Sequence, residues 1–245
     1  MMRKTVLAAA VAAAVAVPGF ANAQATSPHT VAGNMSIVSD YRFRGLSQTY
    51  LQPAIQGGID YSHASGFYLG NWNSNVTGTS FADGTIEMDL YGGFKKEFGA
   101  VTLDVGLLQY MYPGAEAAGV KYDTLEAYIG ASWKWFTLKY STTLDDFFGL
   151  PDTDGSGYLD LSASYEIAPK LTLVAHVGQQ KVKNNKPLDY VDYKIGITYD
   201  LNGWVLGAAY IDTDADKPTY SVTNLAGETK DLAKGTVVFS VSKSF

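Results

Sequence analysis

The sequence predicts an all-β protein, an antiparallel transmembrane β-barrel of about 12 strands. Two features of the sequence predict it. Apolar and polar residues alternate with a period of two, and clusters of Gly, Asn, Asp, Pro and Ser separate the alternating segments. The composition agrees, because the 25 glycines and 17 tyrosines among 245 residues disfavour helices, and aromatic side chains favour strands.

Residues 1–23 are predicted to be a cleaved secretory signal peptide, which leaves residues 24–245 as a single barrel domain. Arg3 and Lys4 supply the positive start, residues 6–17 are apolar, and Ala21 to Ala23 form a small-x-small cleavage site. The alternative is a membrane anchor, but the apolar stretch is shorter than the ~20 residues that a spanning helix needs. Loss of Arg3 and Lys4 takes the net charge from −6 to about −8, which argues against a nucleic-acid partner.

Twelve segments carry the strand signal, and most approach the ~10 residues that a tilted membrane strand requires. An even number of strands returns both termini to one side of a barrel. The predicted strands are residues 35–44, 55–61, 66–74, 86–94, 101–107, 125–133, 136–144, 159–167, 171–180, 191–199, 204–211 and 236–245.

The connections between these segments alternate in length, which is typical of outer-membrane barrels with short turns at one rim and long loops at the other. The short connections are residues 63–65, 95–100, 134–135, 168–170 and 200–203. The long connections are residues 45–53, 75–84, 113–123, 145–157, 181–189 and 213–234. We therefore expect the chain in the outer membrane of a Gram-negative bacterium, in contact with its lipids and lipopolysaccharide.

The last segment alternates through Val237, Phe239 and Val241 and ends in Phe245. It resembles the C-terminal signal that the barrel assembly machinery recognises, although Lys243 stands where an apolar residue is usual. We expect that machinery to be a partner through Phe245.

Four stretches carry a wider resemblance: SDYRFRGLSQ at residues 39–48, GFYLGNWNSNV at 66–76, EMDLYGGF at 87–94 and VSKSF at 241–245. The chain resembles the TorF family of porins in these stretches and over essentially all of residues 24–245. The resemblance implies an outer-membrane β-barrel with a channel role. It brings no established substrate or catalytic set, so it assigns no role to any residue.

In the barrel interpretation the polar side of each strand faces a water-filled lumen, and the function is passive diffusion of small hydrophilic solutes or ions. Acidic residues outnumber basic ones on that side, which predicts a weak cation preference, with a transverse field near Arg42 and Arg44. The opposing hypothesis is that these charges pair across a plugged lumen. The predicted pore-lining residues are Asp40, Arg42, Arg44, Asp60, Glu87, Asp89, Lys95, Asp104, Glu126, Lys139, Asp160, Glu166, Asp192 and Lys194.

Two other functions stay open. Alternation alone also fits a soluble periplasmic β-barrel that turns its apolar side inward to bind an apolar ligand. An outer-membrane hydrolase would need a serine and a base, and His176 lies on the polar side of its segment. The sequence contains no Gly-x-Ser-x-Gly or His-Glu-x-x-His motif, so we interpret His176 as a polar residue of the lumen and expect no enzyme.

No cofactor or metal site is expected. The chain has no cysteine and only three histidines, which excludes thiolate chemistry and limits other metal sites. Residues 152–160 match the first nine positions of a calcium loop, but Ala163 takes the place of the closing carboxylate. A polar, turn-rich loop is the favoured interpretation of this stretch. Aromatic side chains near the segment ends, Tyr41 and Phe43 among them, are expected at the membrane–water boundary.

Overall fold

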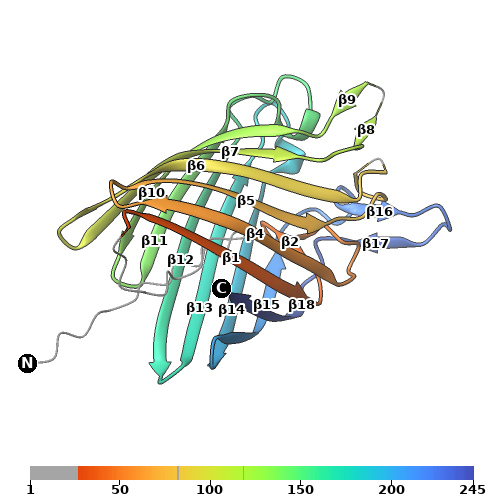
Figure 1. The fold of residues 1–245 in the computed structure, drawn as a ribbon. Coiled ribbons are helices and arrows are strands. Elements are labelled where there is room, and N and C mark those ends of the chain that lie inside the picture. Colours follow the sequence, from red (N-terminus) through yellow and green to blue (C-terminus); the bar gives the residue numbers. More distant parts are fainter. Residues whose placement is uncertain (1–26, 82, 118) are drawn as a thin grey trace, which may run out of the picture.

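A computed structural model describes residues 27–81, 83–117 and 119–245 of the chain. Within these residues, twelve long strands form one closed antiparallel barrel (Figure 1), so the predicted fold is confirmed. The predicted signal peptide lies outside the described residues and stays a prediction. The barrel strands are β1 (His29–Val38), β4 (Ala54–His63), β5 (Phe67–Asn75), β6 (Ile86–Phe98), β7 (Val101–Met111), β10 (Thr124–Trp133), β11 (Phe136–Thr143), β12 (Gly157–Ala168), β13 (Leu171–Lys181), β14 (Tyr190–Leu201), β15 (Trp204–Thr213) and β18 (Thr236–Ser244).

The barrel closes where β1 pairs with both β4 and β18. The register places His29 opposite His63 on one side of β1 and Asn34 opposite Ser244 on the other. Every other barrel strand pairs with its neighbours along the chain, so the wall is a continuous meander. This arrangement leaves no open edge, which a strand-built membrane protein requires.

The two rims differ as the connection lengths predict. At one rim, tight turns join the strands; Asn202 and Gly203 form one of them, with φ of 54° and 87°, as in the hairpin turns that match strand twist. Strand β6 extends four residues beyond its predicted end, to Phe98, and shortens the next turn. At the other rim lie the small hairpins β8–β9 (Glu116–Ala117, Val120–Lys121) and β16–β17 (Ser221–Thr223, Thr229–Asp231), and the 3₁₀ turns η1 (Phe147–Gly149) and η2 (Lys186–Leu188). A third hairpin, β2–β3 (Arg42–Phe43, Leu46–Ser47), belongs to the connection between β1 and β4.

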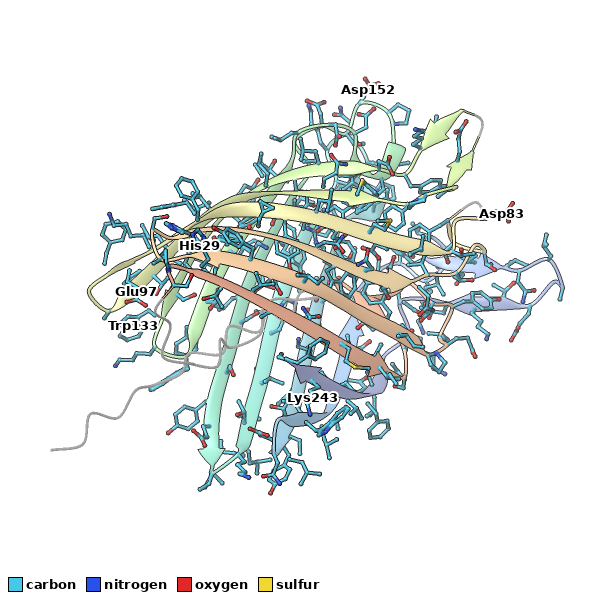
Figure 2. The ribbon with its side chains drawn as sticks, viewed as in Figure 1. His29, Asp83, Glu97, Trp133, Asp152 and Lys243 are labelled. Atoms are coloured by element: carbon cyan, nitrogen blue, oxygen red, sulfur yellow. The ribbon has the colours of Figure 1, made fainter. Side chains whose placement is uncertain are left out.

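Figure 2 shows this polarity through labelled side chains, with His29, Glu97 and Trp133 at the short-turn rim and Asp83 and Asp152 at the long-loop rim. The β8–β9 and β16–β17 hairpins project past the wall at the long-loop rim (Figure 1). No helix among the described residues has the length and apolarity to cross a membrane.

The apolar side of each strand faces outward. Ile55, Ile59 and Ile195 are 69%, 62% and 58% exposed, and similar side chains surround the barrel. Between them, polar residues such as Asp60 and Asp192 are buried in the interior. A soluble barrel that binds an apolar ligand needs the opposite orientation, so that alternative is wrong for this chain.

The closing seam of the barrel uses the last residue of the chain. Phe245 and Gly33 exchange two backbone hydrogen bonds, of 2.7 and 3.0 Å, which extend the β1–β18 ladder. The Phe245 ring lies over Gly33, where an added Cβ would come within 2.7 Å of the ring. Gly33 therefore provides the space that seats the terminal aromatic side chain.

We expect Gly33→Val to weaken the seam, because overpacking of a close contact typically costs about 1–3 kcal/mol. The measurement is the fraction of purified protein that migrates as the compact, heat-modifiable barrel on gels after refolding, which should fall. Val31→Leu is the matched control, since Val31 is 69% exposed on the same face of the same strand. Equal folded fractions for the two variants would contradict a seating role for Gly33.

Candidate functional site

Residues 39–53, here called the inserted segment, connect β1 to β4 and cross the inside of the barrel. The sequence predicts that the strand continues to Arg44, but β1 ends at Val38 and this prediction is wrong. Along the inserted segment, side chains contact strands around the wall: Tyr41 packs on Trp72 of β5, Phe43 on Tyr110 of β7, and Arg44 binds β10 and β13.

The tip of the inserted segment is the turn between β2 and β3. Arg44 and Gly45 both have positive φ, 46° and 82°, which produces a tight hairpin turn. A Cβ on Gly45 would lie 2.7 Å from Cβ of Asp192, so only glycine lets the tip approach β14 this closely. The inserted segment therefore reaches from β1 to β14.

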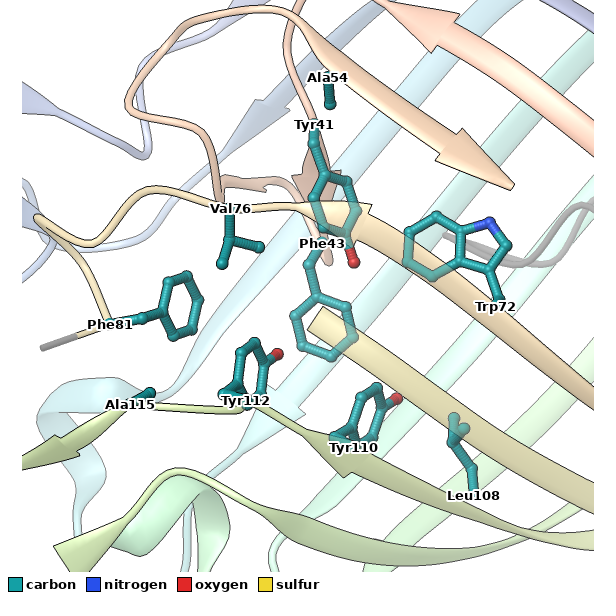
Figure 3. Packing of buried hydrophobic residues seen from close by; sticks show 10 residues of the cluster. All are labelled: Tyr41, Phe43, Ala54, Trp72, Val76, Phe81, Leu108, Tyr110, Tyr112 and Ala115. Atoms are coloured by element: carbon teal, nitrogen blue, oxygen red, sulfur yellow. The ribbon is translucent and has the colours of Figure 1, made fainter. Parts of the chain in front are cut away.

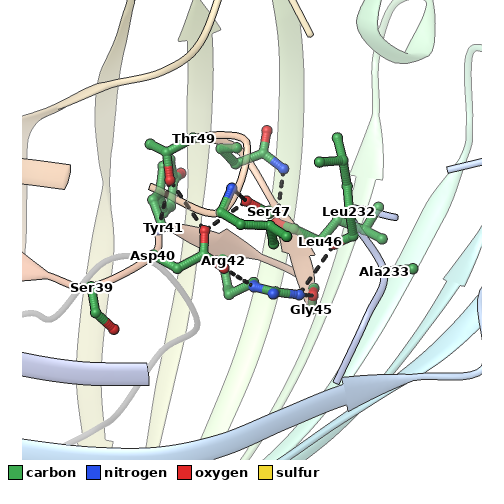
Figure 4. A network of polar contacts seen from close by, with 12 residues as sticks. Ser39, Asp40, Tyr41, Arg42, Gly45, Leu46, Ser47, Thr49, Leu232 and Ala233 are labelled. Atoms are coloured by element: carbon green, nitrogen blue, oxygen red, sulfur yellow. Dashed lines mark hydrogen bonds and ion pairs between the residues drawn. The ribbon is translucent and has the colours of Figure 1, made fainter. Parts of the chain in front are cut away.

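The base of the inserted segment is held by Asp40 (Figure 4). Its carboxylate accepts hydrogen bonds from Nε of Arg42 at 2.5 Å, from Oγ of Ser47 at 2.6 Å and from Oγ1 of Thr49 at 3.1 Å. Arg42 also donates to the backbone oxygens of Gly45 and Leu232, at 3.0 and 3.1 Å. Asp40 and Arg42 thus fix the shape of the hairpin.

Arg44 joins the inserted segment to the wall. Its Nη2 donates to both carboxylate oxygens of Glu126 at 2.8 Å, and its Nη1 donates to Oε1 of Gln180 at 2.8 Å. The guanidinium carbon lies 4.7 Å from the ring centre of Phe43 and 4.3 Å from that of Tyr158. Burial alone would lower the pKa of Arg44, but Glu126 raises it above the ordinary value, so the charge is permanent.

An aromatic cluster fills the space between the inserted segment and the wall (Figure 3). Tyr41, Phe43, Trp72, Tyr110 and Tyr112 are all buried in it. The expectation that Tyr41 and Phe43 lie at the membrane boundary is therefore wrong. Burial, and then the nearby carboxylate of Glu87, raise the pKa of the Tyr41 phenol, so it stays neutral.

The long-loop half of the lumen is filled as a result. Glu87, Asp89 and Glu126 point inward from the wall, yet their exposed fractions are 0%, 1% and 2%. Side chains that line open water would retain much larger exposed fractions. In this state the inserted segment occupies the space that an open pore would need there.

The short-turn half contains a cavity of about 350 Å³. Asp60, Asp104 and Lys95 contribute to its lining, and each has a polar partner: Tyr91 and Asn34 donate to Asp60, while Tyr68 and Lys95 contact Asp104. Lys139 lies deeper in the lining, with its ammonium nitrogen 4.2 Å from the ring centre of Tyr128. The cavity is a vestibule that lies between the inserted segment and the short-turn rim.

The predicted pore-lining residues occupy three kinds of position. Glu166 is exposed near a short turn, where its carboxylate accepts a hydrogen bond from the backbone of Lys170. Asp40, Arg42 and Arg44 are inside the barrel but on the inserted segment, so their predicted place on the wall is wrong. The remaining residues are buried or half-buried on wall strands: Asp60, Glu87, Asp89, Lys95, Asp104, Glu126, Lys139, Asp160, Asp192 and Lys194.

His176 forms a buried ionic cluster that the sequence does not predict. Its Nδ1 lies 2.8 Å from Oδ2 of Asp160 and its Nε2 lies 2.6 Å from Oδ2 of Asp192. A neutral imidazole carries only one N–H, so two carboxylate partners indicate the charged ring. Tyr158 donates to Asp192 at 2.8 Å and Ser162 donates to Asp160 at 2.7 Å, which completes the cluster.

This cluster does not favour the hydrolase alternative. Oγ of Ser162 lies 3.3 Å from Nδ1 of His176, close to the distance between a nucleophile and its base. The Ser162 hydroxyl, however, donates to Asp160, and both ring nitrogens face carboxylates. His176 therefore has no free nitrogen to accept a proton from Ser162.

The loop over residues 152–160 does not gather its carboxylates either. Asp154 pairs with Lys183 at 3.0 Å, and Asp160 belongs to β12, where it binds His176. Throughout residues 27–81, 83–117 and 119–245, no three or more His, Asp or Glu side chains form a group suited to a metal ion. The interpretation as a polar loop accounts for this stretch.

Residues 22–245 match the model of Gcw_chp, described as a bacterial protein of unknown function. The chain belongs to the Gcw_chp family. The TorF name is not confirmed by this match, and no curated protein matches this Gcw_chp chain.

Two solved structures resemble the Gcw_chp chain in fold. A KdgM porin has a TM-score of 0.53 and 7% identity, over 88% of this chain and 98% of that chain. The NanC porin, in a rhombohedral crystal form, has a TM-score of 0.53 and 10% identity, over 88% of this chain and 99% of that chain. At these identities the likeness shows a shared barrel fold.

Proposed function

We propose that this Gcw_chp protein is an outer-membrane channel of a Gram-negative bacterium for passive diffusion of small hydrophilic solutes or ions. The distribution of burial carries the proposal, because apolar side chains are exposed around the wall while charged ones are buried inside it. In water such a surface would be a very large apolar patch, whereas in a bilayer it contacts hydrocarbon. The fold shared with the KdgM and NanC porins supports the same function.

The charges inside the barrel support a weak cation preference. Asp60, Glu87 and Asp89, on β4 and β6, have no basic side chain within 4.0 Å among the described residues, and neither Lys139 nor Lys194 has an acidic one there. Acidic side chains outnumber basic ones on the interior, so the lumen carries net negative charge as long as Glu87 and Asp89 are ionised and bind no cation. A negative lumen raises the local concentration of cations.

The inserted segment determines the state of the channel. Because it fills the long-loop half and leaves a vestibule below, we infer that the described state is closed or nearly closed. Permeation then requires the inserted segment to move aside. Phe245 at the closed seam is the proposed contact for the barrel assembly machinery, and the apolar belt is the proposed contact for lipids and lipopolysaccharide.

Planar-bilayer recording of the purified, refolded protein tests the proposal. We expect brief single-channel steps and, in a salt gradient, a reversal potential that indicates weak selectivity for the cation. Protein boiled before addition is the control and should give no steps. Absence of steps from both the native chain and a variant with a released inserted segment would overturn the channel function.

A further inference from the structure

The pairing of interior charges leaves two acidic side chains on β6 uncompensated. Asp40 pairs with Arg42, Glu126 with Arg44, Asp104 with Lys95, and His176 pairs with both Asp160 and Asp192. Within the described part of the chain, Glu87 and Asp89 have no ion pair. They are also among the most deeply buried side chains of the barrel, at 0% and 1% exposed.

The oxygens of these two carboxylates also have few other partners. Oε1 and Oε2 of Glu87 and Oδ1 of Asp89 accept no hydrogen bond from the described residues, although all three atoms are inaccessible to solvent. Burial of ionised carboxylates without donors or counter-charges is costly, because nothing replaces the water they lose. Uptake of protons relieves this cost, and so does a compensating positive charge between the two side chains.

Tyr41 supplies an independent indication of a ligand at this place. Its side chain is only 3% exposed, and its hydroxyl has no hydrogen-bond partner among the described residues. The Tyr41 ring packs on Trp72, whose cross-strand partner is Asp89, so its hydroxyl lies on the side of the wall that carries the β6 carboxylates. Figure 3 shows the hydroxyls of Tyr41 and Tyr112 pointing toward the middle of the aromatic cluster. Phenol and carboxylate oxygens thus converge from the inserted segment, from β6 and from the end of β7.

We propose that Glu87 and Asp89 bind a divalent cation of the calcium type, with the Tyr41 hydroxyl as a further oxygen ligand. A charge of +2 compensates both carboxylates, and hard oxygen donors are the ligands that Ca²⁺ prefers. Residues two apart on a strand face the same side and lie about 7 Å apart. At this spacing two carboxylate side chains can bind the same ion. The bound ion joins the inserted segment to the wall, independently of whether the barrel conducts.

Terbium luminescence tests the site, because Tb³⁺ substitutes for Ca²⁺ and is excited through nearby tyrosines. After chelator treatment, the refolded native barrel in detergent should show saturable Tb³⁺ emission that Ca²⁺ displaces. We expect Glu87→Gln to weaken Tb³⁺ binding at least 10-fold, and Glu87→Gln with Asp89→Asn to abolish it. These substitutions remove buried charge without changing volume, and heat-modifiable migration on gels verifies that the barrel has folded.

Two control variants separate this site from other acidic positions. Asp60→Asn changes a buried wall carboxylate that already has hydrogen-bond partners, and Asp152→Asn with Asp154→Asn changes the surface loop. Both should keep the native Tb³⁺ titration. Ca²⁺ should also raise the thermal unfolding temperature of the native barrel and leave that of the double Glu87/Asp89 variant unchanged. No saturable emission from the native barrel, or equal titrations for the native and double variants, would overturn the proposal.

Discussion

Replacement of Arg44 by glutamate is expected to open the barrel. In the native chain Arg44 binds both oxygens of Glu126 at 2.8 Å deep in the interior. Arg44→Glu would place two negative charges at that contact, and loss of one partner of a buried ion pair typically costs about 3–5 kcal/mol. The wall strands keep their ladders, so the inserted segment should leave the lumen. Single-channel conductance in planar bilayers should rise several-fold, with longer open times.

A charge swap provides the control for this prediction. Arg44→Glu combined with Glu126→Arg restores opposite charges and should return the conductance most of the way to the native value. Lys183→Glu, which reverses a charge in the exposed pair with Asp154, should leave conductance unchanged. Native conductance in the Arg44→Glu variant would show that the inserted segment does not limit the current.

Replacement of His176 by leucine is expected to lower the free energy of unfolding of the barrel strongly. The charged ring of His176 lies between Asp160 and Asp192, with contacts of 2.8 and 2.6 Å. Its removal leaves two buried carboxylates without the cation that contacts them, so the free energy of unfolding should fall by about 3–5 kcal/mol. Urea unfolding of the barrel in lipid vesicles, followed by tryptophan fluorescence, measures this change.

Two further variants test whether the loss of stability in His176→Leu comes from unbalanced charge. His63→Leu alters a half-buried histidine at the end of β4 and should change the free energy of unfolding by no more than about 1 kcal/mol. His176→Leu combined with Asp160→Leu and Asp192→Leu removes the three charged members of the cluster and leaves Lys194 opposite position 176. It should recover part of the loss, because apolar side chains often replace buried charges without penalty. A triple variant as unstable as His176→Leu would indicate a loss of packing rather than of charge balance.

Much of the fold could be predicted because alternation reports directly on the two sides of a strand. Ile195 and Lys194 are neighbours in sequence and lie on opposite faces of β14, as their chemistry requires. The lengths of the connections also predict that one rim carries short turns and the other carries long loops. Local sequence contains both signals, so no knowledge of distant contacts is needed.

The inserted segment could not be predicted in this way, because a hairpin inside a barrel also has two distinct faces. Tyr41 and Phe43 contact aromatic rings of the wall, while Asp40 and Arg42 bind each other and the nearby backbone. The resulting alternation is identical to that of a wall strand. The Arg44-Gly45 step is the one local sign of a turn, since its positive φ values favour glycine.

Prediction of the cluster at His176 would also require the register of the strands. Only the pairing of β12, β13 and β14 places Ser162 and Lys194 directly opposite His176, with Asp160 and Asp192 at diagonal positions. These residues are 14 to 18 positions from His176 in the chain, and a shift of two residues in register would separate them.

The inserted segment is also hydrogen-bonded to the connection between β15 and β18, whose β16–β17 hairpin projects past the wall. The backbone oxygen of Leu232, in the connection that contains β16 and β17, accepts hydrogen bonds from Arg42 and from the backbone of Ser47, and Tyr50 donates to the backbone oxygen of Glu228 at 2.5 Å. Withdrawal of the inserted segment must break or carry along these bonds. A molecule that binds the β16–β17 hairpin would therefore pull on the inserted segment without entering the barrel.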